Sequence, residues 1–171
     1  IRDYETAAIG IKAALTGHLV LATLHTNDAP STMPRLVNMG VESFLVGSAV
    51  NLVSVQRLAR RICSECKTEE SIPASSLLDA GVTEQDISAF RPMHGAGCPT
   101  CSGTGYKGRT GIYQVMPISA AIGKLIMEGC TSLDLAEQAQ KEGINDLRQS
   151  GLIKVLDGHT SLEEVNRVTK E

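Results

Sequence analysis

The order of apolar and polar residues predicts that helices and strands alternate along the first third of the chain. Residues 3–17 have the features of a helix: Asp3 can cap the first turn, alanines fill the middle, and Gly17 can adopt the left-handed conformation that ends helices. The run HLVLATL, residues 18–24, is apolar on both faces, which is typical of a buried parallel strand. The next elements predicted are a helix over 29–40, a helix from residue 43 and a strand over 55–62. This alternation favours an α/β fold with crossover connections.

The rest of the chain predicts a polar insert, a strand and a helical end. A short helix is expected within DAGVTEQDISAF, and the glycine-rich run that begins at Ser102 leads into a strand. From Ser119 onward the pattern is helical. Two of these helices open alike, with TSLDLAEQ at Thr131 and TSLEEVNR at Thr160, and each has an acid three residues after the threonine. That spacing predicts a capping box at both helix starts.

Composition narrows the class of protein. The chain has 171 residues, of which 42% are hydrophobic and 20% charged, so it can form one core and a small satellite domain. Tryptophan is absent and there are only three Tyr and two Phe, so the core must be aliphatic. A net charge of −3 argues against a protein that coats nucleic acid. No apolar run reaches the roughly 18 residues that a membrane span needs.

Four of the five cysteines form two Cys-x-x-Cys pairs, Cys63 with Cys66 and Cys98 with Cys101. Each such pair supplies two thiolates from one tight turn, and four converging thiolates bind Zn²⁺ with no open position for catalysis. The 31 residues between the pairs exceed the usual spacing, but the entropic cost of closing a loop rises only slowly with its length. The pattern therefore favours a structural zinc site, with a thioredoxin-like redox pair or a disulfide as the alternative. Cys130 has no partner in the sequence.

A cluster of polar residues follows the predicted strand over 18–24. The run HTND, residues 25–28, comes directly after the carboxyl end of that strand, where open α/β sheets bind ligands. The imidazole of His25 could donate a hydrogen bond to a phosphate oxygen there. The alternative is that the last three residues of the run cap the helix that follows. His18, at the other end of the strand, has by itself the features of a structural residue.

Five runs spread over nearly the whole chain occur in an order shared with a known family. They are IRDYETA, ALTGHLVLATLHTNDAPSTMPRLVNMGV, QRLARRIC, CSGTGYKGRTGIYQVMPIS and NDLRQSGLIKVLDGHTSLEEVNRVTKE. Together they resemble the secretion-superfamily ATPases, the hexameric motors of type IV pilus assembly and type II secretion. The last run is more similar to the pilus extension ATPase than to the secretion ATPase.

The resemblance implies an α/β fold: part of a RecA-like (P-loop NTPase) sheet with helices, a small tetracysteine zinc insert and a C-terminal helical subdomain. It implies the following divisions: the distal part of the ATPase core at 1–62, the zinc insert at 63–105, the strand that returns to the core at 106–117, and the helical subdomain at 118–171. The 171 residues contain no Walker A loop, Gly-x-x-x-x-Gly-Lys-[Ser/Thr], and in the family the acidic Walker B residue immediately precedes the position of Ile1. Because the chain also begins without methionine, we expect the C-terminal part of a motor domain that does not hydrolyse ATP by itself.

The resemblance also implies roles for single residues. His18 and His25 match the histidine box of the family, which contacts the nucleotide and senses its γ-phosphate. The four paired cysteines match the zinc ligands of the family. Arg57, Arg60 and Arg61 form a basic patch that we interpret as surface or inter-subunit charges. No complete catalytic set is expected within the chain.

For the longer protein, the resemblance implies ATP and Mg²⁺ as cofactors besides structural Zn²⁺. It further implies a homo-hexamer that acts on an inner-membrane platform protein, located in the cytoplasm and peripheral to that membrane, with no nucleic-acid partner. Two alternatives stay open. One is a type II secretion ATPase, and the other is a non-enzymatic zinc-ribbon or chaperone-type binding module, because CPTCSGTG also matches the repeat of J-domain chaperones.

Overall fold

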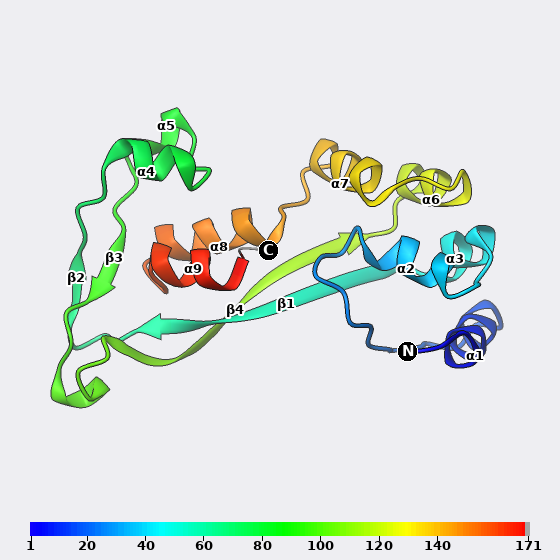
Figure 1. Ribbon diagram of the computed structural model, residues 1–171, viewed down its shortest axis with the longest axis horizontal. Coiled ribbons are helices and arrows are strands. Elements are labelled where there is room, and N and C mark those ends of the chain that lie inside the picture. Colours follow the sequence, from blue (N-terminus) through cyan, green and yellow to red (C-terminus); the bar gives the residue numbers. More distant parts are fainter. Residues whose placement is uncertain (170–171) are drawn as a thin grey trace. The chain divides into compact units, whose positions relative to one another are not determined.

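The computed structural model describes residues 1–169 and divides the chain into two compact units. Unit 1 comprises Ile1–Val55 and Gln114–Asn145, and unit 2 comprises Gln56–Tyr113 and Asp146–Glu171. The chain passes between the units along two paired strands, β1 (Leu52–Ile62) and β4 (Tyr106–Pro117), whose arrows run in opposite directions in Figure 1. The described part is therefore a mixed α/β structure, which confirms that much of the predicted fold class.

Unit 1 is built mainly from helices. They are α1 (Tyr4–Leu15), α2 (Thr32–Asn38), α3 (Ser43–Ala49), α6 (Ala120–Met127) and α7 (Ser132–Lys141). Helix α3 packs against α6 and also contacts α1 and α2, as Figure 1 shows. The buried hydrophobic residues in this unit are aliphatic or sulfur-containing, among them Met33, Val46, Met116, Ile122 and Leu135. This agrees with a core that has almost no aromatic side chains.

Helix starts and stops in unit 1 follow the sequence signals. The carboxylate of Asp3 accepts a hydrogen bond from the backbone N–H of Thr6 at 2.8 Å, and Gly17 has a φ of +90° just after α1. At the start of α7, Thr131 accepts from the N–H of Asp134, whose carboxylate accepts in return from the N–H of Thr131. The predictions for the helix over 3–17 and for this capping box are confirmed.

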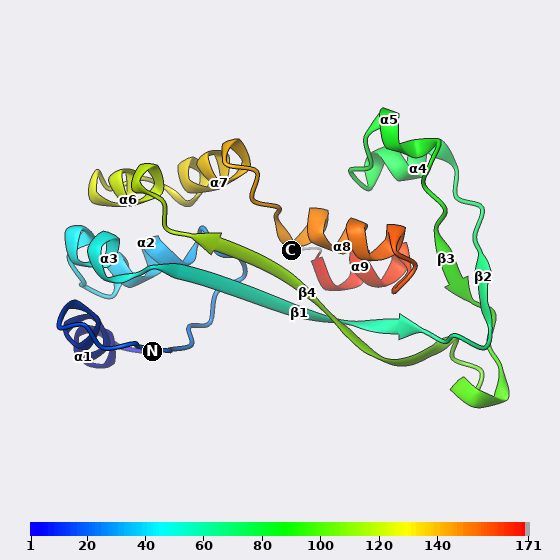
Figure 2. The same cartoon turned by 180° about the vertical axis from the view of Figure 1, so that it is seen from behind.

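Unit 2 consists of short strands and helices around its own core. Its further elements are β2 (Lys67–Glu69), α4 (Ala74–Asp79), α5 (Glu84–Ile87), β3 (Met93–Gly95), the 3₁₀ turn η1 (Pro99–Cys101), α8 (Leu147–Leu156) and α9 (Leu162–Thr169). Strands β2 and β3 pair antiparallel with Thr68 opposite His94, and α8 lies beside α9 in Figures 1 and 2. The core combines Ala59 and Ile112 from the long strands with Val155 and Val165 from α8 and α9.

Two sequence predictions are wrong in the described residues. The run 18–24 does not form a strand, and residues 18–23 are exposed, with Leu19 and Leu21 both at 88%. The backbone N–H and C=O groups of a strand need hydrogen-bond partners on an adjacent strand. Neither of the two described sheets includes this run, so it has no adjacent strand to pair with there. The second predicted capping box, between Thr160 and Glu163, is replaced by a single cap: Ser161 accepts from the N–H of Glu164 at the start of α9, while the carboxylate of Glu164 accepts from arginines.

The four-part division of the chain, with its last part at 118–171, stays a prediction. Residues 170 and 171 of that part lie outside the described residues. Within residues 1–169, no helix combines the length and apolar character that crossing a bilayer requires.

Candidate metal centre

The first Cys-x-x-Cys pair sits where strand β1 gives way to strand β2. Cys63 directly follows β1, and its backbone N–H donates to the carbonyl of Gly105 at 2.9 Å, so the end of the strand is tied to the chain that precedes β4. The N–H of Cys66 donates to the carbonyl of Cys63 at 3.4 Å, which closes a tight turn. This turn directs both sulfurs to the same side.

The second pair is carried by the 3₁₀ turn η1. The backbone N–H groups of Cys98 and Gly105 both donate to the Sγ atom of Cys101, each at 3.2 Å. The turn closes through Ser102, which has a left-handed φ of 52°. Two N–H donors on one sulfur stabilise the thiolate form, which is the form that binds metal.

Close backbone contact locks the turn against strand β3. A Cβ atom added to Gly105, which has a φ of +74°, would lie 2.3 Å from the carbonyl oxygen of Gly95. A Cβ added to Gly95 would in turn lie 2.0 Å from the carbonyl oxygen of Gly105. Both positions therefore require glycine, because any side chain would push the second pair away from the first.

The four-cysteine cluster, which comprises Cys63, Cys66, Cys98 and Cys101, brings four sulfurs together within 4.8 Å of one another. The sulfur–sulfur distances are 3.8 Å for Cys63 to Cys98, 3.8 Å for Cys66 to Cys101, and 3.7 Å for Cys98 to Cys101. Bonds of about 2.3 Å from a tetrahedral Zn²⁺ to sulfur would place neighbouring sulfurs about 3.8 Å apart. A disulfide, by contrast, needs about 2.05 Å. The geometry fits metal binding, and all four cysteines are free.

The thiols of the cluster differ in their acidity. Burial raises the pKa of Cys101, but the two backbone N–H donors outweigh it and bring that pKa down to about 6. Burial raises the pKa of Cys66 to about 12, aided by the neighbouring thiols. Without a cation, the cluster thus holds at least one thiol protonated at neutral pH, and a divalent metal ion would remove that constraint. Four sulfur ligands leave no open position, so such an ion would support the fold rather than catalyse a reaction.

The two histidines of the predicted nucleotide site are exposed. His18 has Nδ1 at 3.1 Å from Oγ1 of Thr16, next to the end of α1. His25 lies on the extended run that leads to α2. No grouping of potential metal ligands in the described residues includes either of them. Their role at a nucleotide stays a prediction.

The residues after His25 support the turn before α2. Thr26 Oγ1 lies 2.9 Å from Oγ1 of Thr32, and the carboxylate of Asp28 accepts from the N–H of Ser31 at 2.7 Å. The alternative interpretation, in which this run organises the start of the following helix, therefore accounts for Thr26 and Asp28. That interpretation does not account for His25, whose side chain is exposed.

The comparison with protein families bears on the whole chain. A family model described as "Type II/IV secretion system protein" matches residues 1–167. The chain belongs to this family. The resemblance inferred from the five sequence runs is thereby confirmed, and the match gives no support to a zinc-ribbon or chaperone-type module.

Curated relatives with pilus and secretion names match the entire chain or nearly so. Type IV pilus assembly ATPase PilB of Pseudomonas aeruginosa is 54% identical over 171 residues, which are 100% of this chain and 30% of that protein. The protein of the same name from Myxococcus xanthus is 51% identical over 166 residues, 96% of this chain and 29% of that protein. Type II secretion system protein HxcR of Pseudomonas aeruginosa is 45% identical over 171 residues, 100% of this chain and 32% of that protein. The chain thus spans about 30% of the length of the PilB relatives.

A buried carboxylate that binds the last residues of strand β1 was not identified from the sequence. Glu164 of α9 is 0% exposed, and its two oxygens accept from the guanidinium groups of Arg60 and Arg167 at 2.6 to 2.9 Å and from the backbone N–H of Arg60 at 2.8 Å. Burial raises the pKa of Glu164, but the hydrogen bonds from the two arginines outweigh it and lower that pKa to about 2. The available signal was its position four residues before Val168, on the apolar face of the helix.

Arg60 is consequently more than a surface charge. Its guanidinium group, besides pairing with Glu164, lies 4.1 Å from the ring centroid of Tyr106. Within the basic patch of Arg57, Arg60 and Arg61, Arg60 keeps 44% of its side chain exposed, as a surface charge does, and it also pairs inside its own chain; an inter-subunit role of the patch stays a prediction.

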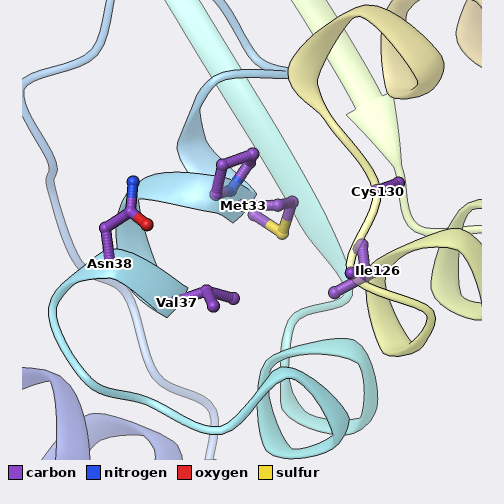
Figure 3. A pocket seen from close by; sticks show the side chains of 7 residues that line it. Met33, Val37, Asn38, Ile126 and Cys130 are labelled. Atoms are coloured by element: carbon purple, nitrogen blue, oxygen red, sulfur yellow. The ribbon is translucent and has the colours of Figure 1, made fainter.

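Cys130 lies apart from the four-cysteine cluster, as its isolation in the sequence predicted. It lines a small open pocket of about 150 Å³ in unit 1, together with Met33, Val37 and Asn38 of α2 and Ile126 of α6 (Figure 3). Burial, together with the nearby Asp134, raises the pKa of the Cys130 thiol. Because the thiolate is the reactive form, the raised pKa makes this thiol less reactive than an ordinary cysteine.

Proposed function

We propose that the chain is the C-terminal part of the motor domain of an ATPase that drives type IV pilus assembly. The observation that supports this most is the 54% identity to PilB of Pseudomonas aeruginosa over the whole chain, within a family match to residues 1–167. A role in type II secretion is the second candidate, because HxcR is 45% identical over the same residues. The larger identity favours the pilus.

The proposed activity belongs to a longer protein. Phosphoryl transfer needs a loop whose backbone amides and lysine surround the phosphates, with Mg²⁺ bridging them, and the 171 residues contain no Walker A sequence. In that protein, the exposed run 18–24 becomes a strand of a RecA-like sheet, and His18 and His25 stand at the nucleotide. The exposure of Leu19, Leu21 and His25 supports this, because these residues are available for such neighbours.

Hydrolysis assays test the assignment of the histidines. In the longer protein, His25→Ala should lower the rate of ATP hydrolysis at least tenfold, the order of loss that follows removal of one group that contacts the reacting phosphates. His94→Ala is the matched control, because this imidazole lies on β3 beside Thr68, and it should keep the parental rate. A His25→Ala variant that hydrolyses ATP at the parental rate would contradict the proposed role, and hydrolysis by residues 1–171 alone would contradict the need for an upstream loop.

The metal of the four-cysteine cluster is proposed to be Zn²⁺. Four thiolates in a tetrahedron are the ligand set typical of structural zinc, and the sulfur separations of 3.7 and 3.8 Å support it. When bound, the ion supplies cross-linking rather than chemistry. Elemental analysis of the purified chain should find one zinc per chain, and a metal-free, stably folded chain would contradict the proposal.

Assembly and location follow the same proposal. Rings of six such subunits would let the nucleotide state of one subunit alter its neighbour, and the motion would pass to an inner-membrane platform protein from the cytoplasmic side. Size measurement of the longer protein with and without nucleotide should show a hexamer. A protein that stays monomeric in both conditions would contradict this part of the proposal.

A further inference from the structure

The connection between α8 and α9 occupies one edge of strand β1 immediately before the metal centre. The N–H of Ile62 donates to the carbonyl of His159 at 3.0 Å, and Oγ1 of Thr160 donates to the carbonyl of Arg60 at 2.8 Å. The N–H of Arg60 donates to Glu164, so a carboxylate stands where a neighbouring strand would otherwise accept. Since the other strand of this sheet is β4, the last residues of β1 are held on both edges.

The same connection contacts the chain beside the second cysteine pair. The hydroxyl of Tyr106 lies 2.7 Å from Oγ of Ser161, and Tyr106 directly follows Gly105, whose N–H donates to Cys101 Sγ. A Cβ atom added to Gly158 would collide with the Nζ atom of Lys67, which directly follows Cys66. Segments that enter or leave both cysteine pairs are thus packed against residues 158–164.

We propose that Glu164 is a positioning residue for the metal centre. With Arg60 and Arg167 it forms a clamp, the Glu164 clamp, that fixes the end of β1 so that Cys63 can reach the metal. The inference rests on the proposed function only in taking the four-cysteine cluster to bind Zn²⁺. Linkage is reciprocal: the clamp raises metal affinity by the same factor by which bound metal strengthens the clamp.

Competition with a chromophoric chelator measures the Zn²⁺ affinity of the reduced chain and tests this. We expect Glu164→Gln, which keeps the shape of the side chain but not its charge, to weaken Zn²⁺ binding about tenfold. Tyr106→Phe removes only the hydroxyl that meets Ser161, so it should weaken binding about threefold and still fold. Because Ser161 also accepts from the N–H of Glu164, Tyr106→Phe loosens the support of the clamp, so Glu164→Gln and Tyr106→Phe together are the clamp variants, and the second keeps the test decisive if the first fails to fold.

Arg148→Ala is the matched control. Arg148 also ties α8 to its surroundings, because it donates to the carbonyl of Ala80 at 2.7 Å and to the side chain of Asn166 at 3.0 Å, and neither of these partners lies beside a cysteine pair. This variant should lose stability while its Zn²⁺ affinity stays within twofold of the parent. Equal losses of affinity in the control and the clamp variants would overturn the inference, since the clamp would then act only through general stability.

Amide hydrogen exchange of the zinc-bound protein gives an independent readout. Residues 62–66 should exchange faster in Glu164→Gln and Tyr106→Phe than in the parent or in Arg148→Ala. Unchanged affinity and unchanged exchange in the clamp variants, with one Zn²⁺ still bound, would overturn the positioning role alone. A parent chain that binds no Zn²⁺ at all would overturn the proposed metal site together with it.

Discussion

The four-cysteine cluster and the run from His18 to Asp28 are both candidate sites, and they depend on their surroundings in opposite ways. The cluster is held by the turns of its two cysteine pairs, by two N–H donors to Cys101 Sγ and by the contact of two glycines, all of which belong to unit 2. The histidine run belongs to unit 1, joins neither described sheet, and exposes Leu19 and Leu21 at 88%. A metal site whose ligands are positioned by local turns can be predicted from the sequence of those turns. A site at the edge of a sheet forms only when the neighbouring strands are present.

Removing one ligand should give the largest difference between the two regions. A structural zinc site contributes apparent binding energies of about 10–16 kcal/mol, so Cys63→Ser should release the metal and unfold much of unit 2. Exchange at amides of unit 1, including α1 and α6, should change little, because these helices pack within their own unit. Metal content and hydrogen exchange measured on the same samples check both statements.

Cys130→Ser is the matched control for that experiment, since Cys130 lies in unit 1 and outside the cluster. It should retain one metal ion per chain and normal exchange in unit 2. Full metal binding by Cys63→Ser, or uniform unfolding of both units, would remove the contrast between the regions.

How far the sequence could predict each region follows from the same contrast. The cysteine spacing predicts a metal site because each Cys-x-x-Cys turn is local, and because the long loop between the pairs adds little to the entropic cost of bringing them together. The helix signals at Asp3 and Thr131 are equally local, and both are confirmed. The run 18–24 has the apolar pattern of a strand, but whether it forms a strand depends on adjacent strands, and the local sequence does not identify those.

The buried hydrogen bonds of Thr160 and Glu164 were also not predictable from the sequence. Glu164 sits in a sequence that reads as a helix start, and the threonine before it suggested a capping box with Glu163. The structure instead uses Ser161 as the cap, while Thr160 and Glu164 turn to strand β1. The local sequence does not distinguish Thr160 from Ser161 as the cap, because the partner that decides between them, Arg60, is 104 residues away in the chain.

Two glycines three residues apart, Gly105 and Gly108, give a matched pair of substitutions that tests the contact at the metal centre. Gly105→Ala combines the strain of a φ of +74° with a clash against Gly95, and should cost about 3 kcal/mol or more. Gly108→Ala has a similar φ of +79°, but nothing lies within 4 Å of the added Cβ, so only about 1 kcal/mol of strain is expected. Chemical denaturation of the zinc-bound chains measures both. Equal losses would mean that contact with β3 does not hold the second cysteine pair.

The smallest change in the free energy of unfolding is expected for a substitution in the run from His18 to Asp28. A small change there is informative because it shows that the run is not packed in this chain. Leu21→Ser replaces an apolar side chain that is 88% exposed, so the free energy of unfolding of this chain should change by no more than about 0.5 kcal/mol. If residues 18–24 become a buried strand in the longer protein, the same substitution should there cost about 2 kcal/mol or more, because a polar group would replace a packed leucine. Denaturation of the two proteins side by side gives both numbers. A large loss already in the 171-residue chain would show that this run is packed without any further partner, and the contrast with the metal centre would then be wrong.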